Sequence, residues 1–553
     1  MTIGSIRIDR IALVAALLLT ALYAFVGLRV LDPEAPFSID AGIKYIQAKA
    51  LRDAAFASTA IPYPARAIDP ELRFLPFGPP FVLEREGRLQ GIFPLAGSFI
   101  YAAVLPGGFP AMVLVSVAAA FVVMLTVGAM GRPHAAAAMV VLGACTWFWV
   151  YGVLLWEHLP ALGFSTASWA LVSGDGRRRP VLAGALLGAA CCLRPESILL
   201  APGFAILARR NARWRTAVVF AAAMCGPLLT VTAMEGLVYD RAPWVHVMHA
   251  VDAVWHGAGA ADIIARPAQV SWASQARTVV GHWVVGLPGL TAALGVIAML
   301  VVANRRDSSL HDAALLAVLV GSAALLGHDV ASAIRQPEPI AGLFRGAPIL
   351  LFAFLPVARG STATRRHRLE QLAAVFFGIG LFSTTEYGGA QIGPRLLTPV
   401  LPMLAALSVE TLVTYRTAAA SDPLAKLVRG LGVVLLVGSV VLQVLANFVS
   451  LRMINSEGRD TLAFVRESGA KSSILVEQYL FNHVAAEYSR ELVLGASTGR
   501  DAAELASRLQ RHAVSPVVTM GRPSGPAIHL PGFEPDRSFS SAHVTVTRWQ
   551  RAP

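Results

Sequence analysis

The stretch that decides the fold runs from residue 108 to residue 155. It reads GFPAMVLVSVAAAFVVMLTVGAM at 108–130, GRPH at 131–134 and AAAAMVVLGACTWFWVYGVLL at 135–155. Each apolar run exceeds the roughly 20 residues that a helix needs to cross a hydrocarbon core about 30 Å thick. The short break between them carries Arg132. The stretch therefore predicts two membrane-spanning helices joined by a tight polar turn.

Runs of the same kind recur along the first 450 residues. The whole chain is 55% hydrophobic and 14% charged, whereas a soluble domain has roughly 45–50% apolar and about 25% charged residues. This composition excludes a single soluble globular enzyme and predicts a polytopic α-helical membrane protein with about 13 transmembrane helices. The expected spans are 10–31, 108–130, 134–155, 158–173, 181–194, 196–208, 215–238, 283–303, 311–328, 345–358, 369–385, 395–415 and 427–450.

The basic residues explain the net charge of +12. They fall in alternate gaps between the apolar runs, as the positive-inside bias of membrane proteins requires. We therefore predict no nucleic-acid partner, a cytoplasmic N-terminus with a retained first span, and an extracytoplasmic C-terminus. The gaps hold Arg132, Arg177 to Arg179, Arg209, Arg210, Arg213, Arg215, Arg305, Arg306, Arg365, Arg366, Arg368, Arg416 and Lys426.

Residues 32–107 form the first long external loop. It opens with SIDAGIKYIQAKAL, in which Ser38 is a helix cap and Ile39, Ile43 and Ile46 recur at helical spacing. We expect an amphipathic helix lying on the membrane. The sequence EREGR at 84–88 then predicts a hairpin turn, and a second apolar helix is expected near 94–105. Residues 239–282 form another external loop.

From about residue 451 the composition becomes that of a soluble fold. Short strands are predicted in SSILVEQY, RELVLGA, SPVVTM and HVTVTRW, and helical segments in FNHVAAEYS and RDAAELASRLQRH. This alternation predicts a small extracytoplasmic α/β domain at 451–553. The membrane-embedded part, residues 1–450 with the loop 32–107, would form the other domain.

The chemistry-bearing residues are ionisable groups at the external ends of spans. The sequence contains no phosphate-binding P-loop, no HExxH zinc motif and no CxxC pair. Asp40 and Lys44 lie one turn apart on the first-loop helix. They form either a surface ion pair or a general base beside a cation that holds an anionic group.

Two external turns interrupt apolar hairpins with charge. Glu157 and His158 in WEHLPAL are not needed for membrane insertion, so a functional role is favoured. Arg194 and Glu196 in LRPES repeat the pattern at the next turn, where Pro195 breaks the helix. The alternative for Arg194 and Glu196 is that they simply pair with each other.

The segment TEYGGAQIGPRLLTPVLP at 385–402 is the most distinctive. Glu386, Tyr387, Gln391 and Arg395 stand among glycines just outside the membrane. An arginine at an outer end runs against the inside bias, so Arg395 is expected to hold a lipid phosphate or a substrate anion.

A further cluster comprises His246, His249, Asp252 and His256. Its spacing fits a divalent metal site, but a helix resting on the membrane surface would show the same face, and we favour the latter. No cofactor is predicted with certainty, and a divalent metal remains an alternative.

At these residues the chain resembles the GT-C superfamily of integral-membrane glycosyltransferases, which use polyprenyl-phosphate-linked sugars as donors. The resemblance covers about residues 1–450. It rests on SIDAGIKYIQAKAL, WEHLPAL and LRPES, and on GGAQIGPRLLTPVLP, which is similar to a GPR-with-prolines segment of bacterial members. It implies a GT-C-like fold, an inner-membrane location and transfer of a sugar to a glycan, lipid or other hydroxyl acceptor on the extracytoplasmic face.

The resemblance also implies roles for residues. Asp40 would be the catalytic base or a carboxylate that orients the acceptor, and Glu157 would be a second active-site acid. Because Ala41 follows Asp40 where protein mannosyltransferases have a second acid, that acceptor class is disfavoured. The donor phosphate would be held by Lys44, His158, Arg194 and Arg395, and the substrate by Glu196, Glu386, Tyr387 and Gln391.

Two other readings remain. Many spans with external charges would also suit a secondary transporter, although transporters place such residues near the bilayer midplane and show repeats. The third reading is a non-catalytic assembly partner.

Overall fold

The structure of the chain is a computed structural model. It describes residues 10–78, 81–130, 134–173, 179–209, 214–239, 308–335, 346–355, 395–418, 423–525 and 528–553, with isolated positions besides. Within these ranges five helical runs are long and apolar enough to cross a membrane. They are Arg10–Val30, Leu95–Met130, Trp214–Val238, Leu397–Thr417 and Pro423–Ser468.

The chain is a multi-pass helical membrane protein, and the count of thirteen crossings stays a prediction. The predicted spans 283–303 and most of 369–385 lie outside the described residues. The helices are α1 Arg10–Phe25, α2 Ile39–Asp53, α3 Leu95–Val104, α4 Gly108–Met130, α5 Ala135–Cys145, α6 Phe148–Val153, α7 His158–Ser173, α8 Arg179–Leu193, α9 Ala201–Ala208, α10 Trp214–Ala233, α15 Ser308–Arg335, α18 Leu401–Ala418, α19 Pro423–Leu442, α20 Val449–Ser468 and α21 Gly499–Arg511.

Shorter helical turns extend or join these helices. The π-helical segments are η1 Val26–Val30, η6 Met234–Val238 and η10 Gln443–Phe448. The 3₁₀ segments include η4 Pro195–Leu200, η8 Pro348–Phe354, η9 Arg395–Val400, η11 Gln478–His483 and η12 Ala485–Glu487. Because η10 continues α19 into α20, the chain passes residue 450 in one helical run.

The expected span at 134–155 is not one continuous helix, because the helix breaks at Thr146. This residue has an extended backbone, and its hydroxyl donates to the Leu142 carbonyl at 2.6 Å and accepts from the Phe148 amide at 3.2 Å. A side chain that bonds its own backbone in this way competes with the helical ladder. The break ends α5 and is followed by the short helix α6, which leads to the turn that carries Glu157.

Helix α8 packs between α7 and α10. Gly184 and Gly188 face α10 so closely that a Cβ atom at either position would lie 2.1 Å or 2.3 Å from a backbone carbonyl oxygen of α10. Small residues four apart allow such backbone contact between helices in membranes. This packing sets the position of the end of α8, where Arg194 follows.

The first loop folds into a helix and a small sheet. Helix α2 begins after Ser38, whose hydroxyl accepts the Ala41 amide as predicted. The predicted hairpin is present as β4 Val82–Arg85 and β5 Arg88–Gly91, and β3 Ala60–Ile61 pairs with β5 in an antiparallel sheet of order β3-β5-β4.

The C-terminal segment forms a five-stranded sheet of order β7-β6-β8-β10-β9. Strands β6 Ser472–Leu475, β7 Leu492–Gly495 and β8 Val517–Gly521 are parallel, and β10 Thr545–Arg551 runs antiparallel to β8 and to β9 Phe533–Ser540. Strand β9 escaped prediction because most of its residues are exposed at the sheet edge. The predicted helix FNHVAAEYS is instead the 3₁₀ pair η11 and η12.

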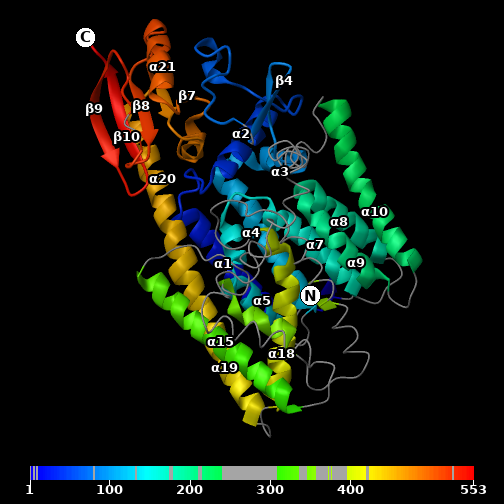
Figure 1. Ribbon diagram of the computed structural model, residues 1–553. Helices are drawn as coiled ribbons and strands as arrows, with labels where there is room; N and C mark the ends of the chain where they lie inside the picture. The colour runs from blue at the N-terminus through cyan, green and yellow to red at the C-terminus, as the bar shows by residue number, and fades with distance from the viewer. Residues whose placement is uncertain are drawn as a thin grey trace, which may run out of the picture.

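The first loop and the C-terminal segment share one hydrophobic core. Ile43 and Ile46 of α2 pack there with side chains such as Phe481 and Val465. The prediction that the apolar face of α2 lies on the membrane is therefore wrong, because this face meets protein. Figure 1 shows the five-stranded sheet, α21 and β4 at one end of the helices, with α2 between that layer and α4.

Candidate active site

Glu157 occupies the turn between α6 and α7. Helix α6 ends at Val153, and Leu154 is extended. Helix α7 begins at His158, where the Glu157 carbonyl accepts the Ala161 amide at 3.0 Å. Pro160 stands in this first turn, where its missing N–H costs no helical hydrogen bond. The turn therefore presents Glu157 at the end of the helices nearest α2.

The Glu157 carboxylate joins two cations from distant parts of the chain. Its Oε2 lies 2.7 Å from Nζ of Lys44, and its Oε1 accepts from a terminal nitrogen of Arg194 at 3.2 Å. The side chains of Lys44 and Glu157 are each only 3% exposed. Buried charges persist in proteins when they are paired in this way.

Arg194 also holds the neighbouring carboxylate. Its Nε donates to Oε1 of Glu196 at 2.6 Å, and a second nitrogen contacts the same oxygen. The predicted pairing of Arg194 with Glu196 is thus present, and it is one link of a longer chain. The order of the chain is Lys44, Glu157, Arg194, Glu196.

The charges within this chain stabilise one another. Burial acts to raise the pKa of the Glu157 carboxyl, but Lys44 and Arg194 outweigh burial and bring its pKa to about 2. Burial lowers the pKa of Lys44 from its ordinary value, while Glu157 and Asp40 act to raise it. Asp40, which is half-buried, thus lies close enough to influence Lys44 electrostatically.

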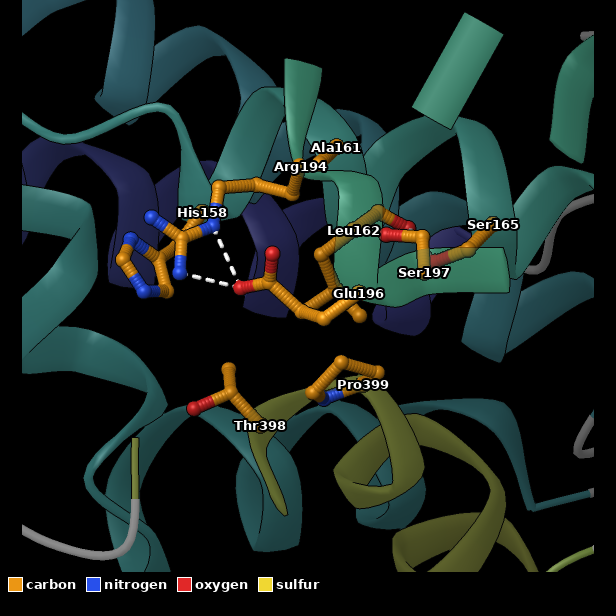
Figure 2. Close-up of a pocket in the computed structure, with 9 residues that line it drawn as sticks. All are labelled: His158, Ala161, Leu162, Ser165, Arg194, Glu196, Ser197, Thr398 and Pro399. Carbon is orange, nitrogen blue, oxygen red and sulfur yellow. Dashed lines mark hydrogen bonds and ion pairs between the residues drawn. The ribbon is translucent and has the colours of Figure 1, made fainter. Parts of the chain in front are cut away.

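A pocket opens beside Arg194, as Figure 2 shows. Arg194, Glu196 and His158 form its charged and polar wall, and Thr398 and Pro399 of η9 lie across from them. The remaining lining residues are Ala161, Leu162, Ser165 and Ser197. The pocket therefore combines a guanidinium with an apolar wall on α7.

Aromatic rings fix the walls of the site. The His158 ring lies 5.1 Å from the Tyr151 ring and 5.0 Å from the Trp156 ring. The Lys44 ammonium stands over the Phe93 ring at 4.5 Å. The Trp147 indole donates to the Thr398 hydroxyl at 3.3 Å, which ties η9 to the break after α5.

The structure brings six of the ten predicted site residues into one region: Asp40, Lys44, Glu157, His158, Arg194 and Glu196. The backbone of Arg395 begins η9, three residues before Thr398. Glu386, Tyr387 and Gln391 lie outside the described residues, as do His246, His249, Asp252 and His256. Within the described ranges no group of three His, Cys, Asp or Glu residues could hold a metal.

Sequence reasoning did not single out Ser165, Ser197, Thr398, Pro399 or Trp147. Thr398 and Pro399 belong to the segment quoted around Arg395, so their nearness to Arg395 was an available signal. Ser165 sits inside an apolar helix, and nothing in its neighbourhood in the sequence distinguishes it.

No protein-family model and no curated protein matches the chain. Among solved structures it is similar to ArnT from Cupriavidus metallidurans bound to undecaprenyl phosphate, at 11% identity over 97% of each chain with a TM-score of 0.47. It is also similar to the oligosaccharyltransferase AglB from Archaeoglobus fulgidus in complex with an inhibitory peptide and a dolichol-phosphate, at 14% identity and a TM-score of 0.46, over 91% of this chain and 69% of that one.

Proposed function

We propose that this chain is a membrane glycosyltransferase that moves a sugar from a polyprenyl-phosphate donor to a hydroxyl group of a glycan or lipid acceptor. The observation that supports it most directly is the buried carboxylate of Glu157, which draws Lys44 of the first loop and Arg194 of the α8 end to one place beside a pocket. Such a site offers cations that can bind a phosphate, and Asp40, which lies near Lys44 on α2, supplies a carboxylate that can act as a base.

The reaction assigns a task to each charged group. The acceptor oxygen attacks the anomeric carbon while the bond from that carbon to the phosphate oxygen breaks, with inversion. The acceptor proton passes to the Asp40 carboxylate, and the departing phosphate gains negative charge that cations stabilise. Arg194 is suited to this second task because it lines the pocket and its planar guanidinium can bind phosphate through two nitrogens.

Glu157 then serves chiefly to hold the cations. It is fully engaged with Lys44 and Arg194, and a carboxylate of such low pKa is a poor proton acceptor. We propose that Glu157 orients the two cations, that His158 and Arg395 complete the phosphate site, and that Glu196 contacts the sugar together with Glu386, Tyr387 and Gln391. Leu162 and Ala161 would border the lipid chain.

The orientation in the membrane follows from the basic residues. Arg179, Arg209, Arg416 and Lys426 stand at the helix ends opposite to Glu157. Under the positive-inside bias the site faces the extracytoplasmic side, and we propose the bacterial inner membrane as its location.

Asp40→Asn tests the activity. The variant keeps the size of the side chain and removes its basicity, so transfer of labelled sugar from a polyprenyl-phosphate donor should fall by about 10²-fold or more. Donor binding and the melting temperature should change little, because Asp40 is only half-buried. Full activity in the variant would remove Asp40 from catalysis. Failure of the wild type to transfer sugar from any lipid-linked donor would favour a transporter instead.

A further inference from the structure

The C-terminal segment of the chain packs against the first turns of helix α2, where the helix's charged residues begin. Gly42 faces η11 and η12, and a Cβ atom at this position would lie 3.0 Å from the Ala485 Cβ and 3.3 Å from the Phe481 ring. The helix therefore approaches the C-terminal segment as closely as a glycine allows. Because Lys44 is two positions further along the helix, it points in a different direction from Gly42 and meets Glu157.

A hydrogen bond holds the entry to the same helix. The Asn482 side chain donates to the Pro36 carbonyl at 3.0 Å, and both residues are buried. Pro36 stands two residues before the Ser38 cap. A displacement of Pro36 would therefore be passed to the first turn of α2, which includes Asp40.

The side-chain amide of Asn482 is only partly satisfied by hydrogen bonds. The residue is 5% exposed, and its Oδ1 atom is buried with no hydrogen-bond partner in the described part of the chain. An unsatisfied buried polar atom destabilises the folded chain, because it loses its hydrogen bonds to water without a replacement. Packing alone would favour an apolar residue at this position. The hydrogen bond to the Pro36 carbonyl therefore accounts for the asparagine.

We propose that Asn482 is a positioning residue that holds the first turns of α2, and with them Asp40 and Lys44, in register with Glu157. The inference rests on the proposed function. It makes the C-terminal segment a structural part of the active site, since η11 sets the position of Asp40 and Lys44 on α2 relative to Glu157 and Arg194.

The experiment compares Asn482→Ser with Tyr488→Phe in the full-length chain. The Tyr488 hydroxyl donates to the Pro62 carbonyl at 2.9 Å, so the control also removes one hydrogen bond between the C-terminal segment and the first loop, but at Pro62 and not at the entry to α2. Two quantities are measured: transfer kinetics with a labelled polyprenyl-phosphate sugar, and hydrogen exchange of the backbone amides of residues 41–44.

Asn482→Ser should lower kcat by about tenfold or more with donor KM changed less than about twofold, because misplacement of a reacting group affects the chemical step. Exchange at residues 41–44 should quicken in this variant and stay at the wild-type rate in Tyr488→Phe. Equal kcat values for the two variants, or unchanged exchange in Asn482→Ser, would overturn the proposal. If the wild type transfers no sugar, the proposed function fails, whereas the exchange data still decide whether Asn482 holds α2.

Discussion

Breaking the buried ion pair between Lys44 and Glu157 should lower the free energy of unfolding by an amount that the geometry allows us to estimate. In Glu157→Gln the side chain keeps its shape and loses its charge, which leaves the Lys44 ammonium buried against Phe93 and Trp156. Arg194 is less affected, because Glu196 remains as its partner. The expected loss therefore comes mainly from the lysine.

The magnitude follows from the geometry. At the 2.7 Å between Nζ and Oε2, Coulomb's law with an effective dielectric constant of about 20 gives roughly 6 kcal/mol of attraction. The cost of burying both charges offsets part of this gain. Removing one partner of a buried pair typically costs about 3–5 kcal/mol, which is the loss expected for Glu157→Gln.

A second substitution isolates the charge effect. Lys44→Met combined with Glu157→Gln removes both charges and should recover most of the lost stability, ending within about 1–2 kcal/mol of the wild type. The control is Asp53→Asn on the same helix. It breaks the 2.9 Å ion pair between Lys49 and Asp53, whose side chains are 29% and 57% exposed respectively. The free energy of unfolding should fall by no more than about 0.5 kcal/mol.

The assay is reversible unfolding of the purified protein in mixed micelles, followed by tryptophan fluorescence. The reasoning would be refuted if Glu157→Gln lost less than about 1 kcal/mol. It would also be refuted if the double variant were no more stable than the single one.

Three further predictions concern other parts of the chain. Arg395→Ala should weaken donor binding more than Arg395→Lys, because lysine keeps the charge and loses only the planar guanidinium. If both variants bound the donor with the affinity of the wild type, Arg395 would not bind the phosphate. Burial lowers the pKa of His483 to about 4, below its value of about 6.5 in the unfolded chain. The contribution of the neutral His483 to the free energy of unfolding is therefore fully present above about pH 6.5 and is lost as the pH falls towards 4, by at most about 3 kcal/mol. His483→Gln should flatten this pH dependence of the melting temperature, and an unchanged slope would contradict the prediction. A reporter fused at Gly499 should report an extracytoplasmic position, and a cytoplasmic signal would reverse the topology.

The membrane character and the local structure of the first loop follow from the sequence. Runs of more than 20 apolar residues admit only a spanning helix, because a lipid-exposed backbone must bond internally. The Ser38 cap and the EREGR turn act through neighbours in the chain, so α2 and the β4–β5 hairpin were predictable. The same holds for Arg194 and Glu196, which pair across one residue.

Other features depended on contacts between residues far apart in the sequence. The apolar stripe of α2 is equally suited to lipid and to protein, and only the C-terminal core, through side chains such as Phe481, decides between them. The sequence likewise did not determine the ion-pair partner of Lys44. Asp40 is one helical turn away, but the ammonium pairs at 2.7 Å with Glu157, more than a hundred residues later, because a buried charge needs a close partner. Local pattern thus determined which residues were charged and at which helix ends they stood, whereas long-range packing determined which of those charges meet.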